Sequence, residues 1–223
     1  MHKINSKMYE IDSGIQFDFP TGEKGIFFFK NFQITEEFIN DMVLARQNHT
    51  GTNIIYPDEY NKFEFFDGLV SYRSVKQYLG VKTADCLPVL FASEKLKGCF
   101  HSGWRGLING IVENLYEKVK IMGEDFSEIT FVIGPHICGR CYEVKEDVAD
   151  IFIRFAKEKG ISQSLFMYFK DHKIFIDLAS CCKALLKTFS VKKIFDVQIC
   201  VKEDMRFFSR RRGDNSSQIS VIF

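Results

Sequence analysis

The sequence predicts an α+β fold, in which a mixed β-sheet and flanking helices form a single domain over residues 1–223. Short runs rich in aromatic and β-branched residues are typical of strands, and they are interspersed with a few amphipathic stretches of helical period. The order of these segments is mixed rather than a strict alternation of strand and helix, which favours the α+β class. No internal repeat, low-complexity tract or Pro/Gly-rich linker divides the chain.

The strand candidates are short apolar runs with aromatic or β-branched residues. In chain order they are Gly25–Phe29, Asn53–Tyr56, Leu69–Tyr72, Pro88–Ala92, Gly98–His101, Ile129–Ile133, Ile174–Ile176 and Ile194–Val201. Four helices are expected, the first over Thr35–Arg46 with Glu36 and Glu37 in its first turn, where the helix dipole favours acids. The other three are indicated by apolar residues at helical spacing: Leu107 to Val119, which follows Gly103–Trp104, Val148 to Phe155, which ends at Gly160, and Leu178 to Phe189.

The composition restricts the class of protein. Lys and Arg (30) nearly balance Asp and Glu (29), which argues against an extended nucleic-acid surface. The 24 Phe residues are expected to fill the interior. The segment Met1–Ser13 lacks the apolar region of a signal peptide, and no apolar run is long enough to span a membrane. Seven cysteines without an export signal are therefore expected to be reduced thiols of a cytoplasmic protein.

Three segments place a His or a Cys at the boundary between predicted elements. Arg46–Gly51 joins a helix to a strand, Thr83–Pro88 is a turn that leads into a strand, and His101–Gly106 joins a strand to a helix. Side chains from separate segments can converge at such boundaries. We therefore expect the functional site at these three segments.

His49, Cys86 and His101 would make a suitable Zn²⁺ site, because zinc binds nitrogen and sulfur ligands tetrahedrally and three protein ligands leave a fourth position open. Bound zinc would hold Cys86 as a thiolate at neutral pH. No short ligand knuckle links the three residues, so their spacing does not establish the site. His49 as an ordinary hydrogen-bonded residue and Cys86 as a small buried hydrophobe are interpretations that the residues alone leave open.

The predicted helix that begins near Trp104 suggests an anion site. Ser102 can cap this helix, Gly103 and Gly106 permit close approach of a ligand to the backbone, and Arg105 adds positive charge. The two glycines could equally serve tight helix packing, because they do not form a complete nucleotide-binding fingerprint.

Other cysteines and arginines have simpler interpretations. Cys138–Cys141 is a lone C-x-x-C without the second pair of a zinc ribbon, so ordinary thiols are expected there and a thioredoxin-like redox role is the alternative. Cys181 and Cys182 fall within a predicted helix, with one thiol in the core. The basic stretch Arg206–Arg212 would either meet phosphate or form a solvated turn.

Several blocks of the sequence together resemble the laccase-domain proteins, once called multicopper polyphenol oxidases and now regarded as a purine nucleoside phosphorylase family. In order and spacing, the blocks are Gln47-x-His49, Thr83-Ala84-Asp85-Cys86-Leu87-Pro88-Val89, His101-Ser102-Gly103-Trp104-Arg105-Gly106, Ile133-Gly134-Pro135 with Cys141-Tyr142-Glu143-Val144, and Phe207-Phe208-Ser209-x-Arg211-Arg212. The resemblance covers the chain from about Gln47 to Arg212.

The resemblance implies one Zn²⁺ held by His49, Cys86 and His101, in a domain whose mixed β-sheets form a sandwich flanked by helices. It also implies phosphorolysis of adenosine, inosine, guanosine and methylthioadenosine, together with deamination of adenosine. The expected partners are therefore purine nucleosides and phosphate, without nucleic acid or membrane. The sequence does not define the oligomeric state.

Site residues follow from the same blocks. We expect Gln47, Gly103, Arg105 and Tyr142 to contact substrate, with phosphate held near Gly103 and Arg105. Cys86 and Asp85 are the expected catalytic residues, the latter as a proton carrier or as the group that orients a ligating histidine.

The chain also departs from the family pattern. An early Arg and Gly-Gly loop is missing, since Gly25–Asn31 leads directly into a predicted helix, and Asp214–Ser217 stands where relatives have Thr-Gly-Arg. His136 replaces the usual residue after Gly-Pro and adds a nitrogen to which the sequence assigns no role.

Four functions remain as hypotheses. A zinc-dependent phosphorylase comes first, and a Cys–His thiol hydrolase that uses Cys86 and His101, or a related cell-wall (peptidoglycan) editing role, is the alternative. A copper polyphenol oxidase ranks lower, because five His residues cannot supply a multicopper centre. The fourth is a non-enzymatic module in which zinc is structural, with a closed coordination shell.

Overall fold

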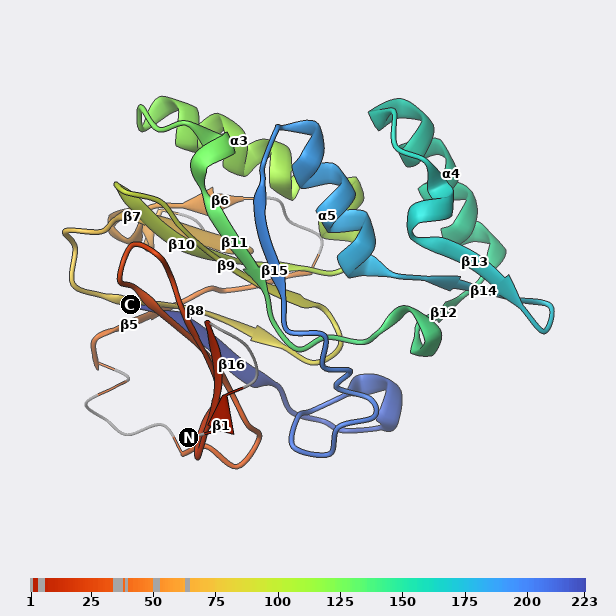
Figure 1. Ribbon diagram of the computed structural model, residues 1–223, viewed down its shortest axis with the longest axis horizontal. Coiled ribbons are helices and arrows are strands. Elements are labelled where there is room, and N and C mark those ends of the chain that lie inside the picture. Colours follow the sequence, from red (N-terminus) through yellow and green to blue (C-terminus); the bar gives the residue numbers. More distant parts are fainter. Residues whose placement is uncertain (1, 4–6, 34–37, 39, 50–52, 63–64) are drawn as a thin grey trace.

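The computed structural model describes residues 2–3, 7–33, 38, 40–49, 53–62 and 65–223. Two β-sheets pack face to face, and helices cover the outer face of one of them (Figure 1). A third, small sheet lies beside helix α4. This arrangement confirms the predicted α+β class and the sandwich of mixed sheets with flanking helices.

The larger sheet has seven strands in the order β1-β2-β3-β4-β16-β8-β5. Its neighbours are antiparallel except for β5, which is parallel to β8. The strands are β1 (His2–Lys3), β2 (Met8–Ile11), β3 (Gly14–Asp18), β4 (Lys24–Phe28), β5 (Met42–Leu44), β8 (Tyr78–Thr83) and β16 (Gln218–Ile222).

The second sheet has six strands in the order β15-β11-β9-β10-β7-β6, and its two outer pairs are parallel. Its strands are β6 (Ile54–Ile55), β7 (Gly68–Tyr72), β9 (Leu87–Ala92), β10 (Leu96–Ser102), β11 (Thr130–Ile133) and β15 (Lys193–Asp196). The small sheet consists of β12 (Glu143–Val144), β13 (Met167–Lys170) and β14 (Lys173–Ile176).

Four α-helices have both ends within the described residues. They are α2 (Trp104–Ile108), α3 (Ile111–Ile121), α4 (Glu146–Lys159) and α5 (Leu178–Thr188). Helix α4 ends where Gly160 adopts a left-handed conformation, and the Asp177 carboxylate caps α5 by accepting a bond from the Ser180 N–H at 2.8 Å. Short 3₁₀ turns are Pro57–Glu59, Phe126–Glu128, Gly139–Cys141, Gln163–Leu165 and Arg210–Arg212.

All eight predicted strands are present, but one is shorter than expected. The predicted strand Ile194–Val201 ends at Asp196, since the backbone turns where Gln198 has a positive φ of 59°. The other strands were not predicted: β1, β2, β3, β5, β8, β12, β13 and β16. Most of them mix polar residues with apolar ones or are too short to show a clear alternation.

Two predicted helices need correction. The helix expected over Leu107 to Val119, beginning near Trp104, is two helices, because Gly110 has a φ of 97° and separates α2 from α3. The helix predicted over Thr35–Arg46 is wrong in its second half, where Met42–Leu44 forms β5. Its first half lies largely outside the described residues, although Phe38 and Asn40 are helical.

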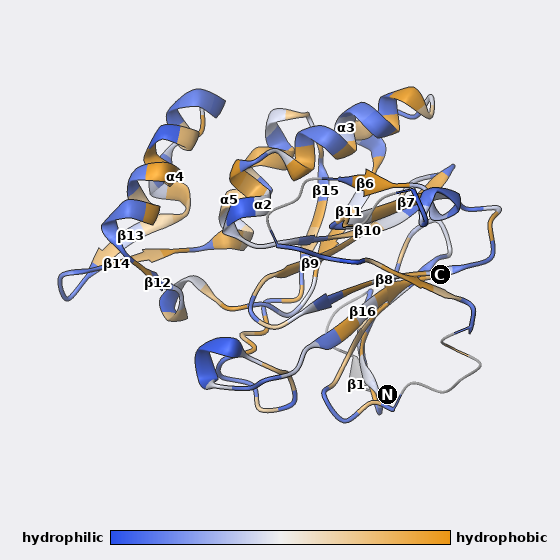
Figure 2. Cartoon of the chain, turned by 180° about the vertical axis from the view of Figure 1, so that it is seen from behind, coloured by the Kyte–Doolittle hydropathy of each residue, from blue (hydrophilic) through white to orange (hydrophobic). Residues whose placement is uncertain are grey.

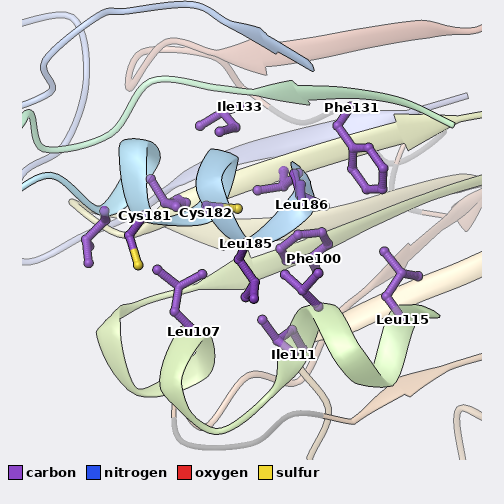
Figure 3. Packing of buried hydrophobic residues seen from close by; sticks show 14 of the residues in the cluster. Phe100, Leu107, Ile111, Leu115, Phe131, Ile133, Cys181, Cys182, Leu185 and Leu186 are labelled. Carbon is purple, nitrogen blue, oxygen red and sulfur yellow. The ribbon is translucent and has the colours of Figure 1, made fainter. Parts of the chain in front are cut away.

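The core lies on both faces of the six-stranded sheet. Along β9, Leu87, Val89 and Phe91 point toward the helices, whereas Leu90 and Ala92 point toward the seven-stranded sheet. Figure 3 shows the helix side, where Leu107, Ile111 and Leu115 pack with Leu185 and Leu186 against the sheet. The central strands are hydrophobic, whereas helices α3 and α4 have one hydrophilic side (Figure 2). Burial on two faces explains why β9 is a continuous apolar run.

Phenylalanine fills this interior, as expected. Nine Phe side chains are among the largest fully buried ones, including Phe91, Phe100 and Phe131. Both Cys181 and Cys182 are buried in the same core, where one buried thiol was predicted. None of the helices in the described part of the chain has the length and apolar character needed to cross a membrane.

We expect Phe91→Ala to destabilise the fold by about 3–5 kcal/mol, because it opens a cavity in the middle of the core. The ring of Phe91 is fully buried, lies over Gly98 and stands 5.6 Å from that of Phe131. Phe169→Ala is the matched control, since Phe169 is 69% exposed, and it should change stability by less than about 0.5 kcal/mol. Urea denaturation measures both, and similar effects of the two substitutions would contradict the described core.

Candidate functional site

The candidate site lies where the chain passes from one sheet to the other. Strand β8 of the seven-stranded sheet ends at Thr83, and strand β9 of the six-stranded sheet begins at Leu87. The turn between them contains Asp85 and Cys86. The neighbouring strand β10 runs antiparallel to β9, so its last residues, including His101, lie beside the first residues of β9.

His49, Cys86 and His101 come together at this point. Each offers one ligand atom, and these atoms all lie within 4.8 Å of one another. Nδ1 of His49 is 3.2 Å from Nε2 of His101, and the two rings are perpendicular. Two nitrogen ligands about 2.0–2.1 Å from a tetrahedral zinc ion would be about 3.3–3.4 Å apart. The three side chains could therefore hold a metal ion.

The orientation of His101 is set by Asp67, which directly precedes β7. Oδ1 of Asp67 lies 2.9 Å from Nδ1 of His101, and both side chains are only 1% exposed. The main chains are also linked, because the His101 N–H donates to the Asp67 carbonyl at 2.7 Å. A proton on Nδ1 that is bonded to Asp67 leaves Nε2 facing His49 and Cys86. Sequence reasoning missed Asp67, and its place before a predicted strand was the available signal.

The Cys86 thiol and the His101 imidazole shift each other's pKa. Burial would raise the pKa of the Cys86 thiol, but hydrogen bonds with His101 and His49 outweigh burial and lower this pKa to about 7. Burial would lower the pKa of His101, but hydrogen bonds with Asp67 and Cys86 outweigh it and raise this pKa to about 9. Between these values the cluster favours a thiolate beside an imidazolium.

Gly103 makes room for the Cys86 thiol. A Cβ atom at this position would lie 3.0 Å from Sγ of Cys86, so only glycine fits without a shift of the neighbour. Gly103 is the N-cap of α2, but Ser102 does not cap the helix as predicted, because its hydroxyl donates to the Gly103 carbonyl instead. Helix α2 has only five residues, and its dipole is correspondingly weak.

Gln47 fixes the segment that contains His49. Its side-chain amide donates to the Lys82 carbonyl and accepts from the Lys82 N–H, each at 2.7 Å. This pair of bonds attaches the segment to the end of β8, much as a neighbouring strand would be attached. His49 itself has a φ of 64°. The predicted contact of Gln47 with substrate stays a prediction, and Thr50 and Gly51 of the same block lie outside the described residues.

Asp85 binds the arginine-rich loop rather than a histidine. Oδ1 accepts a hydrogen bond from the Ser209 hydroxyl at 2.6 Å, and Oδ2 accepts one from the Arg211 backbone N–H at 2.9 Å. Its φ of 86° is unusual for a residue other than glycine. The contact to a ligating histidine that was considered for Asp85 is made by Asp67.

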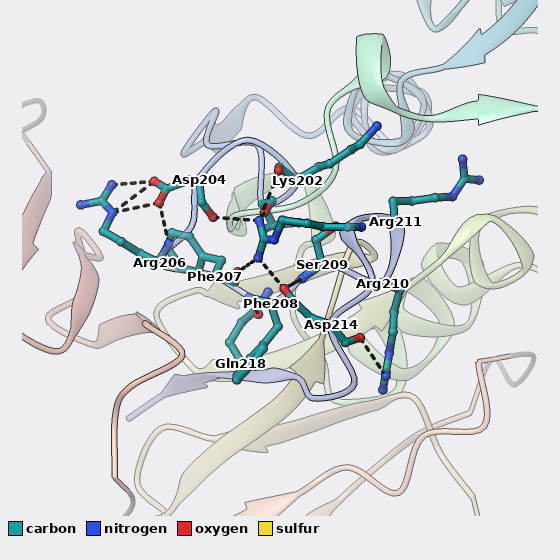
Figure 4. A network of polar contacts seen from close by, with 12 residues as sticks. Lys202, Asp204, Arg206, Phe207, Phe208, Ser209, Arg210, Arg211, Asp214 and Gln218 are labelled. Atoms are coloured by element: carbon teal, nitrogen blue, oxygen red, sulfur yellow. Dashed lines mark hydrogen bonds and ion pairs between the residues drawn. The ribbon is translucent and has the colours of Figure 1, made fainter.

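The stretch Arg206–Arg212 is an ordered loop held by internal polar contacts (Figure 4). Arg212 donates to the Val201 carbonyl at 2.6 Å and pairs with Asp214, and Arg206 pairs with Asp204 at 2.7 Å. Asp214, part of the segment that departs from the family pattern, also accepts from the Ser209 N–H at 2.9 Å. The Arg211 guanidinium instead donates to the Glu143 carbonyl at 2.9 Å and lines the cavity beside Tyr142.

A cavity of about 390 Å³ is lined by Trp104, which follows Gly103, and by Tyr142, Arg211 and neighbouring residues of β12 and α4. The Arg211 guanidinium lies 4.9 Å from the centre of the Tyr142 ring, and Arg105 lies 4.3 Å from that of Trp104. Burial and the nearby Cys86 raise the pKa of the Tyr142 hydroxyl to about 12, against the effect of the two arginines. The predicted residues Tyr142, Arg105 and Cys86 are thus neighbours.

His136 is buried and lies outside this cluster. Its Nδ1 is 2.8 Å from the Gly134 carbonyl oxygen, and its backbone pairs with that of Cys200. The nitrogen that it adds to the family pattern is therefore not one of the ligand atoms near His49 and His101.

The chain is similar in sequence to known proteins of one family. Residues 29–223 match the family described as multi-copper polyphenol oxidoreductase laccase. A Borreliella burgdorferi protein named purine nucleoside phosphorylase is 32% identical over 178 residues, which cover 77% of this chain and 75% of that protein. A protein of an unknown prokaryotic organism named adenosine deaminase is 27% identical over 195 residues, which cover 81% and 73% of the two chains.

Solved structures show the same fold. The crystal structure of a Neisseria meningitidis protein superposes with a TM-score of 0.79 at 24% sequence identity, covering 98% of this chain and 99% of the other. The match of the family extends over most of the sequence, and the resemblance seen in the sequence blocks is confirmed. The chain therefore belongs to the multi-copper polyphenol oxidoreductase laccase family, whose relatives include proteins named purine nucleoside phosphorylase.

Proposed function

We propose that this protein is a zinc-dependent purine nucleoside phosphorylase that also deaminates adenosine. The observation that supports the proposal is the convergence of His49, Cys86 and His101 next to the cavity lined by Trp104 and Tyr142. The names of relatives, purine nucleoside phosphorylase and adenosine deaminase, agree with it.

The three side chains suit zinc better than magnesium. Two imidazole nitrogens and one thiolate form a tetrahedral donor set with an open position, whereas magnesium prefers oxygen ligands. When bound, the metal would supply Lewis-acid activation of water or of a substrate atom. The protein contributes the arrangement around it, since Asp67 orients His101 and Gly103 leaves space at Sγ of Cys86.

The cavity matches the chemistry of a nucleoside. Its volume of about 390 Å³ is in the usual range of small-molecule sites. Trp104 and Tyr142 offer aromatic surface, and stacking of a base on such a ring contributes about 1–3 kcal/mol. We assign these two residues to the purine.

Phosphate would be bound by the arginines around Tyr142. Arg105 and Arg211 both act on the Tyr142 hydroxyl electrostatically, so both positive charges lie near this hydroxyl. A guanidinium can bind phosphate with two parallel hydrogen bonds, which a lysine cannot do. Since α2 is short, the positive charge of this region comes from the arginines rather than from the helix dipole.

In phosphorolysis, a phosphate oxygen forms a bond to C1′ of the ribose while the bond from C1′ to the purine breaks, and the purine leaves with a proton. Arg211 would hold the phosphate in position for this step. Asp85 would act through Arg211, because its carboxylate holds the Ser209 hydroxyl and the Arg211 backbone. Both of its oxygens are engaged there, so we assign it a positioning role instead of proton transfer.

One observation favours a second candidate, a Cys–His thiol hydrolase. The pKa of about 7 for Cys86 beside a His101 of pKa about 9 is what a nucleophilic thiolate requires without any metal. The two candidates differ in their response to metal removal. A chelator abolishes the phosphorylase, whereas it leaves the hydrolase active.

Activity should follow the metal and depend on phosphate. We expect the zinc-loaded protein to form ribose-1-phosphate from inosine only when phosphate is present, and inosine from adenosine also without it. Cys86→Ser should lower kcat/KM by about 10³-fold, because Lewis-acid activation contributes several kcal/mol. Cys181→Ala is the control, since Cys181 is a residue of α5 whose side chain is buried in the hydrophobic core. This variant should retain activity. Chromatography of the products measures both, and full activity after zinc removal would refute the proposal.

Arg211→Ala should raise the KM for phosphate by about 10–100-fold, because a hydrogen bond to a charged group contributes about 1.5–3 kcal/mol. The KM for inosine should change much less. Arg210→Ala provides a neighbouring control, since Arg210 is exposed and donates to the Asp214 carbonyl. Initial rates over a range of phosphate concentrations distinguish the two, and equal effects would contradict the assignment of Arg211.

Zinc affinity should rise with pH, because protons compete with the metal for Cys86 and His101. Between about pH 7 and 9 only His101 must lose a proton, so the logarithm of the affinity should increase by about one per pH unit. Below the Cys86 pKa of about 7 the proton of the thiol must also be displaced, and the slope should become steeper. Competition with a chelator measures the affinity, and a pH-independent value would contradict ligation by these residues.

Asp67→Asn should weaken zinc binding by about 10–100-fold, since the carboxylate no longer supports the imidazole. The His101 pKa should fall, because the substitution removes the anion that favours the imidazolium. Asp196→Asn is the control, because Asp196 lies on β15 and pairs with Lys183 of α5. This substitution should leave zinc affinity unchanged.

A further inference from the structure

A second group of metal-ligating side chains lies outside the site described above. Cys138, Cys141, Cys200 and Glu203 each offer one ligand atom, and these four atoms lie within 4.8 Å of one another. We propose that the three sulfur atoms and a Glu203 oxygen bind a thiophilic divalent cation of the zinc type, separate from the ion held by His49, Cys86 and His101.

The fold brings the four residues together from two segments that are far apart in sequence. His136 forms a parallel β-bridge with Cys200: its N–H donates to the Ile199 carbonyl at 3.1 Å, and its carbonyl accepts from the Val201 N–H at 3.0 Å. Each segment then turns sharply, so that a C-x-x-C corner faces a C-x-x-E corner. The sequence showed no partner for the first pair, because the second corner lacks a second cysteine.

The surroundings of Cys200 favour a thiolate. This side chain is 7% exposed, and the backbone N–H of Cys138 donates to its sulfur at 3.4 Å. Hydrogen bonding by the Cys138 thiol and by the backbone of Glu203 and Lys202 adds to this effect, and together these contacts outweigh burial and lower the pKa of the Cys200 thiol. Backbone N–H groups directed at sulfur stabilise metal-bound thiolates in the same way.

The other ligands are close to the positions that a tetrahedral ion requires. Sγ of Cys141 lies 3.5 Å from Oε1 of Glu203, and Cys138 is in contact with both other thiols. Ligands about 2.3 Å and 2.1 Å from zinc would be about 3.6 Å apart. Arg140 binds both Glu203 oxygens, with Nε donating to Oε1 at 2.9 Å and Nη2 donating to Oε2, and its positive charge offsets part of the negative charge of the ligands. Binding would release the protons of the cysteine thiols to solvent.

The position of this cluster connects it to the candidate active site. The Tyr142 N–H donates to the Cys138 carbonyl at 3.1 Å, and the Ile137 N–H donates to the Asp85 carbonyl at 2.9 Å. An ion at the two corners would hold the segment that leads to Tyr142 against the one that leads to the arginine loop. Three thiolates and a carboxylate close the coordination shell, as in structural zinc sites.

Metal stoichiometry and cobalt absorption test the proposal on the full chain. Purified protein, loaded with Zn²⁺ alone and analysed by mass spectrometry, should contain two ions per chain. Cys86→Ser and the double variant Cys138→Ser/Cys141→Ser should each contain one. With Co²⁺, the thiolate charge-transfer absorption reflects the number of metal–sulfur bonds. It should fall by about a quarter in Cys86→Ser and by about three quarters in the double variant.

Cys181→Ala is the matched control and should keep both ions, since its thiol lies in the core of α5 and belongs to neither cluster. Titration of the zinc-loaded native protein with a chelator tests the same point without a variant. The two ions are expected to leave in two separate phases. A single ion per native chain, two ions retained in the double variant, or a disulfide between Cys138 and Cys141 or Cys200 would overturn the proposal. The ion that Cys86→Ser loses is the one at the first site, so that loss tests the first site and does not bear on the proposal for the second.

Discussion

The buried contact between Asp67 and His101 is the interaction on which the rest of the site depends. Both side chains are removed from water, and a carboxylate in such a place is stable only when it is paired. Within the described residues, Oδ2 of Asp67 has no hydrogen-bond partner, so His101 is the contact that compensates for burial. The same contact directs Nε2 of His101 at His49 and Cys86. The contact between Asp67 and His101 therefore both orients the metal-binding nitrogen of His101 and stabilises the buried charge of Asp67.

The sandwich explains how such a contact can be maintained. Strand β9 is covered by the helices on one face and by the seven-stranded sheet on the other, so the turn before it has a rigid attachment. Asp85, in that turn, binds the arginine loop, and Gln47 binds the end of β8. The Gln47 segment and the arginine loop are thus both attached to the connection between β8 and β9. Polar groups gather there because the apolar strands end.

Sequence predicted much of the fold but not its exceptions. The apolar runs of β9 and β10 are clear because both strands are buried on two faces, whereas Gln218 and Ser220 obscure β16 although both are buried. Met42 and Leu44 suited a helix as well as a strand, and only pairing with β8 decides between them. In the site, boundaries and family blocks indicated His49, Cys86 and His101. Asp67 was indicated only by its place before a predicted strand and Cys200 by nothing, because their roles depend on contacts between distant segments.

The central claim is that His49, Cys86 and His101 bind zinc at the edge of the substrate cavity. Anomalous diffraction from zinc-loaded crystals, recorded on both sides of the zinc absorption edge, tests it most directly. We expect an anomalous peak between the three side chains, about 2.3 Å from Sγ of Cys86 and about 2.0–2.1 Å from the two histidine nitrogens. The absence of a peak at that position in crystals that contain zinc would contradict it.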